Sequence, residues 1–350
     1  MTKAAPGKVS AALFEQVILT HLGAADRAVT VGPRHGVDVG IVDIGGGQVM
    51  AMSADPVFVV PAYGWERAAW FAVHILASDT AVSGLPPRYM SVDLNLPREL
   101  GDDDLARLWE AFSDTCADLG IAVVAGHTGR YDGCNWPMVG GATCIAIGSG
   151  DAWITPVDAR VGDRVLITKG AAVEATALFG ATFPERLASE IGPEHAAAAD
   201  AMFESMTVVP EARVAAEYGL RDAGVTAMHD ATEGGVLGGL AEFADAAGVG
   251  VRVDEGAIPV RPEARATCAA VGIDPLTSIS EGTLLATVRP AHVDGVLTAL
   301  ADAGVEAAEI GEVTPAAEGR ILLRDGAPEP LVHPGQDPFW EAFGRWSAGG

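Results

Sequence analysis

One stretch of the sequence, residues 228–259, limits the possible folds more than any other part of the chain. It starts as a short apolar strand ending near Asp230 and turns at Gly234 and Gly235. It then continues as an amphipathic helix and finishes in a second apolar strand, VGVRVDE. A strand, glycine turn, helix and strand in this order are typical of a sheet covered by helices. The stretch therefore predicts an α/β layer in this part of the chain.

The remaining sequence divides into two halves of different pattern. The first half mixes a predicted hairpin at Gly45–Gly47 with helical segments, one of which begins at Asp102. The pattern breaks at residues 151–156, after which strands and helices alternate. A chain of 350 residues is long enough for about two domains of roughly 150 residues each. We therefore predict an α/β (α+β) protein with domains at residues 1–150 and 151–350.

The charge balance excludes polyanionic partners and suggests an environment of high salt. Lys and Arg number 22 and Asp and Glu number 47, a net charge of −25. Nucleic acid and anionic membranes are also negatively charged, so the net electrostatic interaction with either would be repulsive. Only Lys3, Lys8 and Lys169 are lysines. An acidic, lysine-poor chain fits a halophilic protein, since molar salt screens its self-repulsion; the alternative is an ordinary acidic cytoplasmic protein.

Three features predict a cytoplasmic location. The first residues lack the apolar core and cleavage site of a secretory signal. No apolar run approaches the ~18 to 20 residues of a membrane span. The four cysteines show neither a C-x-x-C motif nor regular spacing, which favours buried thiols in a reducing compartment over a zinc site.

The glycine turn at the centre of residues 228–259 has two possible roles. Main-chain amides at a helix start bind anions, and glycine allows a phosphate to approach closely. Asp230 would then hold a Mg²⁺ ion that bridges phosphate oxygens. Alternatively, Asp230 or Thr232 caps the helix and the glycines only permit close packing. The residues alone leave both interpretations open.

Other polar residues in the first half would complete such a site. Asp38, Asp55 and Asp79 occupy predicted strand ends or turns, and His127 and Thr128 lie in the glycine-flanked segment VAGHTGR. Taken singly, each acid is most simply a solvated loop residue. Taken together, they would supply hard oxygen ligands around a polyphosphate.

An ordered set of motifs gives the chain a family resemblance. The set is GVDVGIVDIG, SADPVF, SDTAVSGLPPRY, AGHTGR, ITKGAAVEATAL, MHDATEGGVLGG and SEGTLLATV, in this order between about residues 30 and 325. It resembles the aminoimidazole ribonucleotide synthetase superfamily, and within it the hydrogenase-maturation carbamoyl dehydratase branch.

The resemblance implies a two-domain PurM-like fold. The N-terminal domain is expected to pair with its twin across a homodimer into a shared β-barrel, and the C-terminal domain to form a layered α/β structure. ATP and Mg²⁺ are the implied cofactors. Matching motif positions assign the metal to Asp55, Asp79 and Asp230, and the nucleotide to Asp38, His127, Thr128, Thr232, Gly234 and Gly235.

The implied reaction is ATP-dependent phosphorylation of an oxygen, which activates a small or protein-bound substrate. Two departures bear on it. His127 stands where many members of the superfamily have Asp, and no cysteine follows Cys268, whereas the dehydratase reacts at a C-terminal cysteine. No catalytic residue is assigned. The alternatives are a small-molecule kinase similar to thiamine monophosphate kinase and a non-catalytic nucleotide-binding scaffold.

Overall fold

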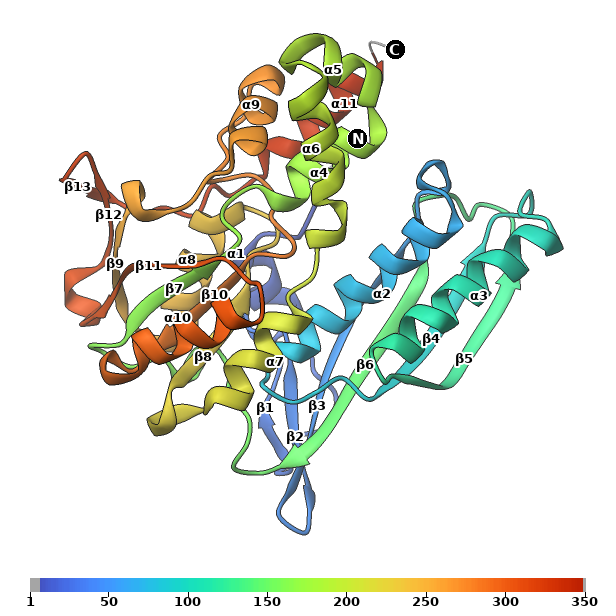
Figure 1. Ribbon diagram of the computed structural model, residues 1–350. Coiled ribbons are helices and arrows are strands. Elements are labelled where there is room, and N and C mark those ends of the chain that lie inside the picture. The colour runs from blue at the N-terminus through green and yellow to red at the C-terminus, as the bar shows by residue number, and fades with distance from the viewer. Residues whose placement is uncertain (1–6, 349–350) are drawn as a thin grey trace. The chain divides into compact units, whose positions relative to one another are not determined.

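The chain divides into two compact units. A computed structural model describes residues 7–348 (Figure 1). Within that range the smaller unit comprises residues 27–32 and 38–153, and the larger comprises 7–26, 33–37 and 154–348. The sequence places the boundary near residue 150 and assigns the first 26 residues to the N-terminal domain. In the structure residues 7–26 group with the C-terminal half, where Lys8 bonds to Thr232 and Glu233.

The smaller unit is a sheet with helices on one face. Its strand order is β1-β2-β3-β6-β4-β5. The helices α2 and α3 pack side by side, with α2 on β3 and β6. The predicted hairpin at Gly45–Gly47 and the predicted helix from Asp102 are both confirmed. The bounds are β1 Val29–Val31, β2 Gly40–Gly45, β3 Gln48–Phe58, β4 Tyr89–Leu96, β5 Ala122–Arg130, β6 Met138–Ser149, α2 Trp65–Ala81 and α3 Asp102–Asp118.

Side-chain alternation decides which face of this sheet the helices cover. In β3 the residues Val49, Ala51 and Ser53 are buried, and the intervening Met50 and Met52 are half-buried. Across the strand pair, Met50 lies opposite Ile147 and Met52 opposite Ile145, both half-buried. Because neighbouring side chains in a strand point to opposite faces, these four residues form an apolar patch on the face away from the buried set.

The larger unit is a layered α/β structure, as predicted. Its strand order is β13-β12-β9-β11-β7-β10-β8. The pairs from β9 to β8 are antiparallel, and β12 pairs parallel to β9. The strands are β7 Arg164–Thr168, β8 Val225–Asp230, β9 Gly250–Asp254, β10 Leu284–Val288, β11 Ala307–Thr314, β12 Arg320–Arg324 and β13 Ala327–Pro330.

The helices of this unit bury apolar faces against the sheet and against one another. Val236 and Leu240 of α8 belong to a core that includes Val251 and Leu285 of the sheet. No helix among residues 7–348 is long and apolar enough to cross a membrane. The helices are α1 Ala11–Leu13, α4 Val173–Thr182, α5 Pro184–Ile191, α6 Pro193–Ala201, α7 Val209–Tyr218, α8 Gly235–Ala247, α9 Pro262–Val271, α10 Val293–Asp302 and α11 Pro338–Ala348.

The C-terminal helix α11 is anchored by aromatic packing. Phe339 and Trp346 lie 5.5 and 5.4 Å from Phe179 of α4, measured between ring centroids. Phe343 lies 5.2 Å from Phe183. Aromatic pairs at these separations contribute about 0.5–1.5 kcal/mol each beyond area burial. Helix α11 is thus held firmly on the larger unit.

The cysteines largely agree with the prediction of buried thiols. All four lie within the described residues and are free. Cys116, Cys144 and Cys268 are buried, and burial raises the pKa of Cys116 and Cys268 to about 12. Cys134 is only half-buried.

Candidate active site

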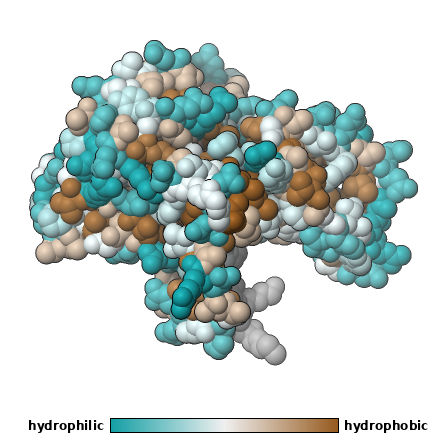
Figure 2. Space-filling view, turned by 90° about the horizontal axis from the view of Figure 1, so that it is seen from below, coloured by the Kyte–Doolittle hydropathy of each residue, from teal (hydrophilic) through white to brown (hydrophobic). Residues whose placement is uncertain are grey.

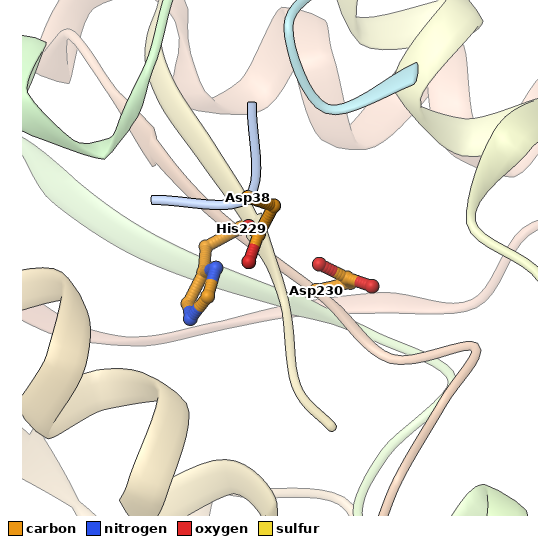
Figure 3. Close-up of side chains that lie close together, drawn as sticks. All are labelled: Asp38, His229 and Asp230. Atoms are coloured by element: carbon orange, nitrogen blue, oxygen red, sulfur yellow. The ribbon is translucent and has the colours of Figure 1, made fainter. Parts of the chain in front are cut away.

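Strand β8 ends in two fully buried polar residues. His229 is 1% exposed and Asp230 is 0% exposed. Figure 3 shows their side chains leaving the strand in different directions, as expected for successive strand residues. A carboxylate shielded from water is costly unless donors or a cation compensate it. The predicted metal ligand Asp230 therefore lies in the kind of environment where a carboxylate binds a cation.

The turn after β8 has the geometry that glycine permits. Gly234 and Gly235 have φ of +83° and +61°. A Cβ on Gly235 would lie 2.6 Å from the carbonyl oxygen of Ser278. The glycines thus bring the start of α8 against the loop before β10.

The amide at the start of α8 already holds an anion from the chain itself. The N–H of Gly234 donates to Oδ2 of Asp337 over 2.7 Å, and Asp337 is 4% exposed. Burial raises the pKa of Asp337 to about 6, although the amides of Phe339 and Gly234 act in the opposite direction. The capping carboxylate is Asp337, and the sequence interpretation, which considered Asp230 and Thr232, missed it.

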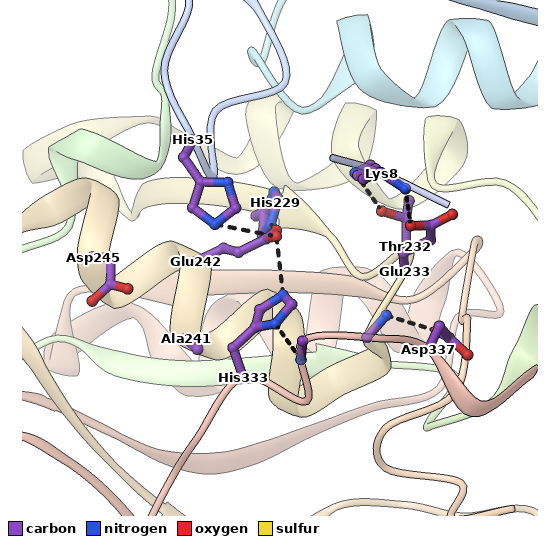
Figure 4. A network of polar contacts seen from close by, with 12 residues as sticks. Lys8, His35, His229, Thr232, Glu233, Ala241, Glu242, Asp245, His333 and Asp337 are labelled. Carbon is purple, nitrogen blue, oxygen red and sulfur yellow. Dashed lines mark hydrogen bonds and ion pairs between the residues drawn. The ribbon is translucent and has the colours of Figure 1, made fainter. Parts of the chain in front are cut away.

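Residues from both ends of the chain contact the same turn. The Lys8 side chain donates to Thr232 Oγ1 over 3.2 Å, and the Lys8 amide donates to Glu233 Oε2 over 2.8 Å. Trp340 of α11 donates its indole N–H to Glu233 Oε1 over 3.2 Å. Figure 4 shows Lys8 on Thr232 and Glu233, with Asp337 beside the turn.

Beneath the turn, one buried carboxylate gathers three imidazoles. Glu242 of α8 is 7% exposed. Its oxygens lie 3.2 Å from Nε2 of His229, 3.3 Å from Nε2 of His333 and 3.7 Å from Nε2 of His35 (Figure 4). Burial by itself would raise the pKa of Glu242, but the hydrogen bonds from His229 and His333 outweigh it and hold that pKa well below its usual range.

A second polar cluster lies at the end of β7. Lys169, with a left-handed φ of +58°, places its amine 2.5 Å from Glu211 and within hydrogen-bond distance of the Thr207 carbonyl. Glu174, in the first turn of α4, accepts from the amide of Glu281 over 3.1 Å. Burial raises the pKa of Glu174 to about 8.

Acids around the turn act electrostatically on Glu174 of the second cluster. After burial, the carboxylates that further raise the pKa of Glu174 are Asp337, Glu233 and Asp230. The larger unit therefore concentrates two buried acids, Asp230 and Asp337, and two half-buried acids, Glu174 and Glu233, around the turn, where a divalent cation would relieve repulsion among those that are ionised.

The predicted residues of the smaller unit occupy different elements from those expected. Asp55 lies inside β3 and Asp79 inside α2, where strand ends or turns were predicted. Both are half-buried. The reason is that β3 and α2 run on past these acids without a break. Asp38 does lie outside regular structure, two residues before β2.

His127 and Thr128 are also not in a turn. They continue β5 and pair with Asp93 and Leu94 of β4. His127 Nε2 lies 2.7 Å from the hydroxyl of Tyr131. Within the smaller unit, Asp55 and Thr128 line two separate grooves of ≈ 450 and ≈ 400 Å³. The first also contains Ser91, Asp93, Gly141 and Thr143, and the second Leu94, Asp102, Leu105 and Trp109.

Comparison with known proteins gives consistent matches along the chain. The sequence matches the N-terminal domain of AIR synthase related proteins over residues 36–148 and their C-terminal domain over residues 160–324. It is 30% identical over 292 residues to the carbamoyl dehydratase HypE of Rhizobium leguminosarum bv. viciae, covering 80% of this chain and 77% of the relative.

Solved structures share the fold. The hydrogenase maturation protein HypE in complex with ATP superimposes with a TM-score of 0.66 at 24% identity, covering 95% of this chain and 97% of that one. Thiamine monophosphate kinase from Aquifex aeolicus gives 0.63 at 17% identity, covering 91% and 97%. At these identities the likeness establishes the two-domain fold.

Proposed function

Because this chain belongs to the family of AIR synthase related proteins, we propose that it is an ATP-dependent enzyme whose reaction resembles that of the carbamoyl dehydratases. The substrate is a small molecule or a protein-bound group with an oxygen that ATP phosphorylates. The observation that carries this proposal is the turn after β8. Its glycine amide binds a carboxylate in the structure, beside the buried Asp230.

The residues of the turn fit Mg²⁺ and a polyphosphate. Asp230 is a hard oxygen ligand of the type Mg²⁺ prefers, and Asp230, Glu233 and Asp337 all act on the pKa of the same neighbouring acid, Glu174. We assign Asp230 to the metal, and Thr232, Gly234 and Gly235 to phosphate oxygens. When bound, Mg²⁺ would neutralise charge on the phosphates. The HypE relative solved with ATP supports the choice of nucleotide.

The predicted residues of the smaller unit extend the assignment. We propose Asp55 and Asp79 as further metal ligands, and Asp38, His127 and Thr128 as nucleotide contacts. His127 can donate a hydrogen bond to a phosphate, but a neutral imidazole is a poor Mg²⁺ ligand. Its hydroxyl partner Tyr131 would hold the ring in place for this contact.

The reaction class can be tested by product analysis. The purified protein would be incubated with ATP, Mg²⁺ and candidate amide or carbamoyl substrates. ADP with free phosphate and a dehydrated product supports the proposal. ADP with a phosphorylated product supports a kinase, the alternative favoured by the fold of thiamine monophosphate kinase. Nucleotide binding without any turnover points to a scaffold.

We further propose that the protein forms a homodimer through its smaller unit. Strand β5 is a sheet edge that pairs only with β4 among the described strands, and its Val123 and Val124 are 37% and 58% exposed. An exposed apolar edge of this kind invites pairing with another chain. Light scattering after gel filtration is expected to give twice the chain mass, and Val124→Asp to lower it. A monomeric wild-type protein would refute the dimer.

The charge balance and the thiols support a halophilic, cytoplasmic enzyme. Figure 2 shows hydrophilic residues across much of one face, with apolar residues among them, and the net charge is −25. The free cysteines fit a reducing compartment. We expect the melting temperature to rise between about 0.1 and about 2 M KCl. Over this range the Debye length falls from ~10 Å to under ~3 Å, so that salt screens the repulsion between the acidic side chains. A flat or falling curve would contradict halophilic adaptation.

A further inference from the structure

The segment of residues 331–348 contacts the turn that is assigned to phosphate. Its Asp337 bridges the starts of two helices: Oδ2 accepts from Gly234 at the start of α8, and Oδ1 accepts over 2.8 Å from Phe339 at the start of α11. A single carboxylate therefore connects the C-terminal helix to the amide that a phosphate oxygen would use.

The neighbouring positions of the turn are engaged as well. Lys8 occupies the hydroxyl of Thr232, and Lys8 and Trp340 share the carboxylate of Glu233. A Cβ on Gly7 would lie 3.0 Å from Oε2 of Glu233, so the N-terminal segment lies directly against this side chain. Three successive residues of the turn are thus held by contacts from the two terminal segments.

The contact made by Asp337 carries an electrostatic penalty. Its carboxylate is buried near Glu233, which raises its pKa further, and near Glu174, whose own pKa it raises. Such an anion is held by the amides of Gly234, Phe339 and Ile279, and repelled by its acidic neighbours. It can therefore yield to a ligand that brings its own cation.

We propose that residues 331–348 act as an internal plug: Asp337 occupies the Gly234 amide in place of a phosphate oxygen, and nucleotide binding displaces it. This inference rests on the proposed function, because it assigns the same turn to the nucleotide. One N–H cannot serve both anions at full strength, and two negative groups at one helix start repel each other. Nucleotide affinity and docking of this segment are consequently opposed.

The test compares Asp337→Asn with wild-type protein, using a non-hydrolysable ATP analogue with Mg²⁺. Asparagine is a good N-cap residue of the same size, but it has one acceptor oxygen in place of two. With that oxygen on the amide of Phe339, its NH2 group would face the amide of Gly234. Because the charge-assisted bond that competes with the nucleotide is then lost, we expect about five- to tenfold tighter binding by calorimetry. Asp254→Asn is the matched control, since Asp254 caps Gly256 in an exposed turn of the same unit.

Hydrogen exchange of the wild-type protein provides a second measurement. Saturating analogue should accelerate exchange of the Phe339 amide at the start of α11, because Asp337 releases it while the aromatic rings of α11 stay packed. Equal affinities of Asp337→Asn and Asp254→Asn, or unchanged exchange in α11, would overturn the plug and leave the ATP-dependent function standing. If neither wild-type protein nor Asp337→Asn binds the analogue, the proposed function and the plug both fail.

Discussion

Replacing Asp230 by asparagine is expected to weaken binding of a Mg²⁺–ATP analogue by at least about 100-fold, since even groups outside the direct ligands of a metal change its affinity by roughly 10- to 100-fold. Asp230 is completely buried at the end of β8. Asparagine has the same shape but lacks the charge that a hard cation prefers. Isothermal titration calorimetry with and without Mg²⁺ measures the effect.

Folding of the nucleotide-free protein should respond much less than nucleotide binding. Asparagine has the size of aspartate and does not carry the desolvation cost of a buried carboxylate, so the melting temperature should change little. Asp254→Asn again controls for the change in net charge. Unchanged nucleotide affinity in Asp230→Asn, with the protein folded, would remove Asp230 from the site.

Replacing Glu242 by alanine is expected to destabilise the larger unit by about 1–3 kcal/mol, the usual cost of leaving a buried hydrogen-bond donor without its acceptor. The change leaves the buried His229 and the half-buried His333 without their shared acceptor. Urea denaturation at pH 7 measures it. Glu242→Gln keeps the shape and one acceptor, so it should lie between alanine and wild type.

The pH dependence of this effect has a definite sign. The folded-state pKa of Glu242 is lowered, so its contribution to stability is fully present above the unfolded value of about 4.3 and declines as the pH falls toward the folded value. The difference between wild type and Glu242→Ala should therefore shrink below about pH 4. Glu217→Ala, which removes an exposed pair with Arg213, should cost only about 0.3–0.5 kcal/mol. A similarly small loss for Glu242→Ala at pH 7 would contradict the role of this carboxylate.

Local sequence patterns predicted the parts of the fold that depend on neighbouring residues. The strand, turn and helix around Gly234 and Gly235 follow from apolar spacing and from glycine, and so does the hairpin at Gly45–Gly47. The positions of Asp55 and Asp79 were wrong in detail. A polar residue inside a strand or a helix does not interrupt its main-chain hydrogen bonds, so an acid alone is a poor sign of an element's end.

The contacts that sequence reasoning missed join distant parts of the chain. Asp337 is 103 residues from Gly234, and Lys8 is 225 residues from Glu233. Glu242 lies on a helix whose other residues from Gly235 to Ala244 are buried and apolar. In the sequence it is therefore only a single polar residue within an apolar helix. Only the fold brings the three imidazoles to it. One local signal was available: Asp337 precedes Pro338 and an aromatic run, the pattern of a helix N-cap.

The attachment of both terminal segments to one turn affects where a tag can be placed on the protein. Lys8 and Trp340 lie near opposite ends of the sequence, yet both hold Glu233. An affinity tag or a fluorescent fusion placed at either end would be attached within about ten residues of Lys8 or Trp340. Ligand-binding measurements are best made on protein from which such additions have been cleaved, and protein tagged at one end should be compared with protein tagged at the other.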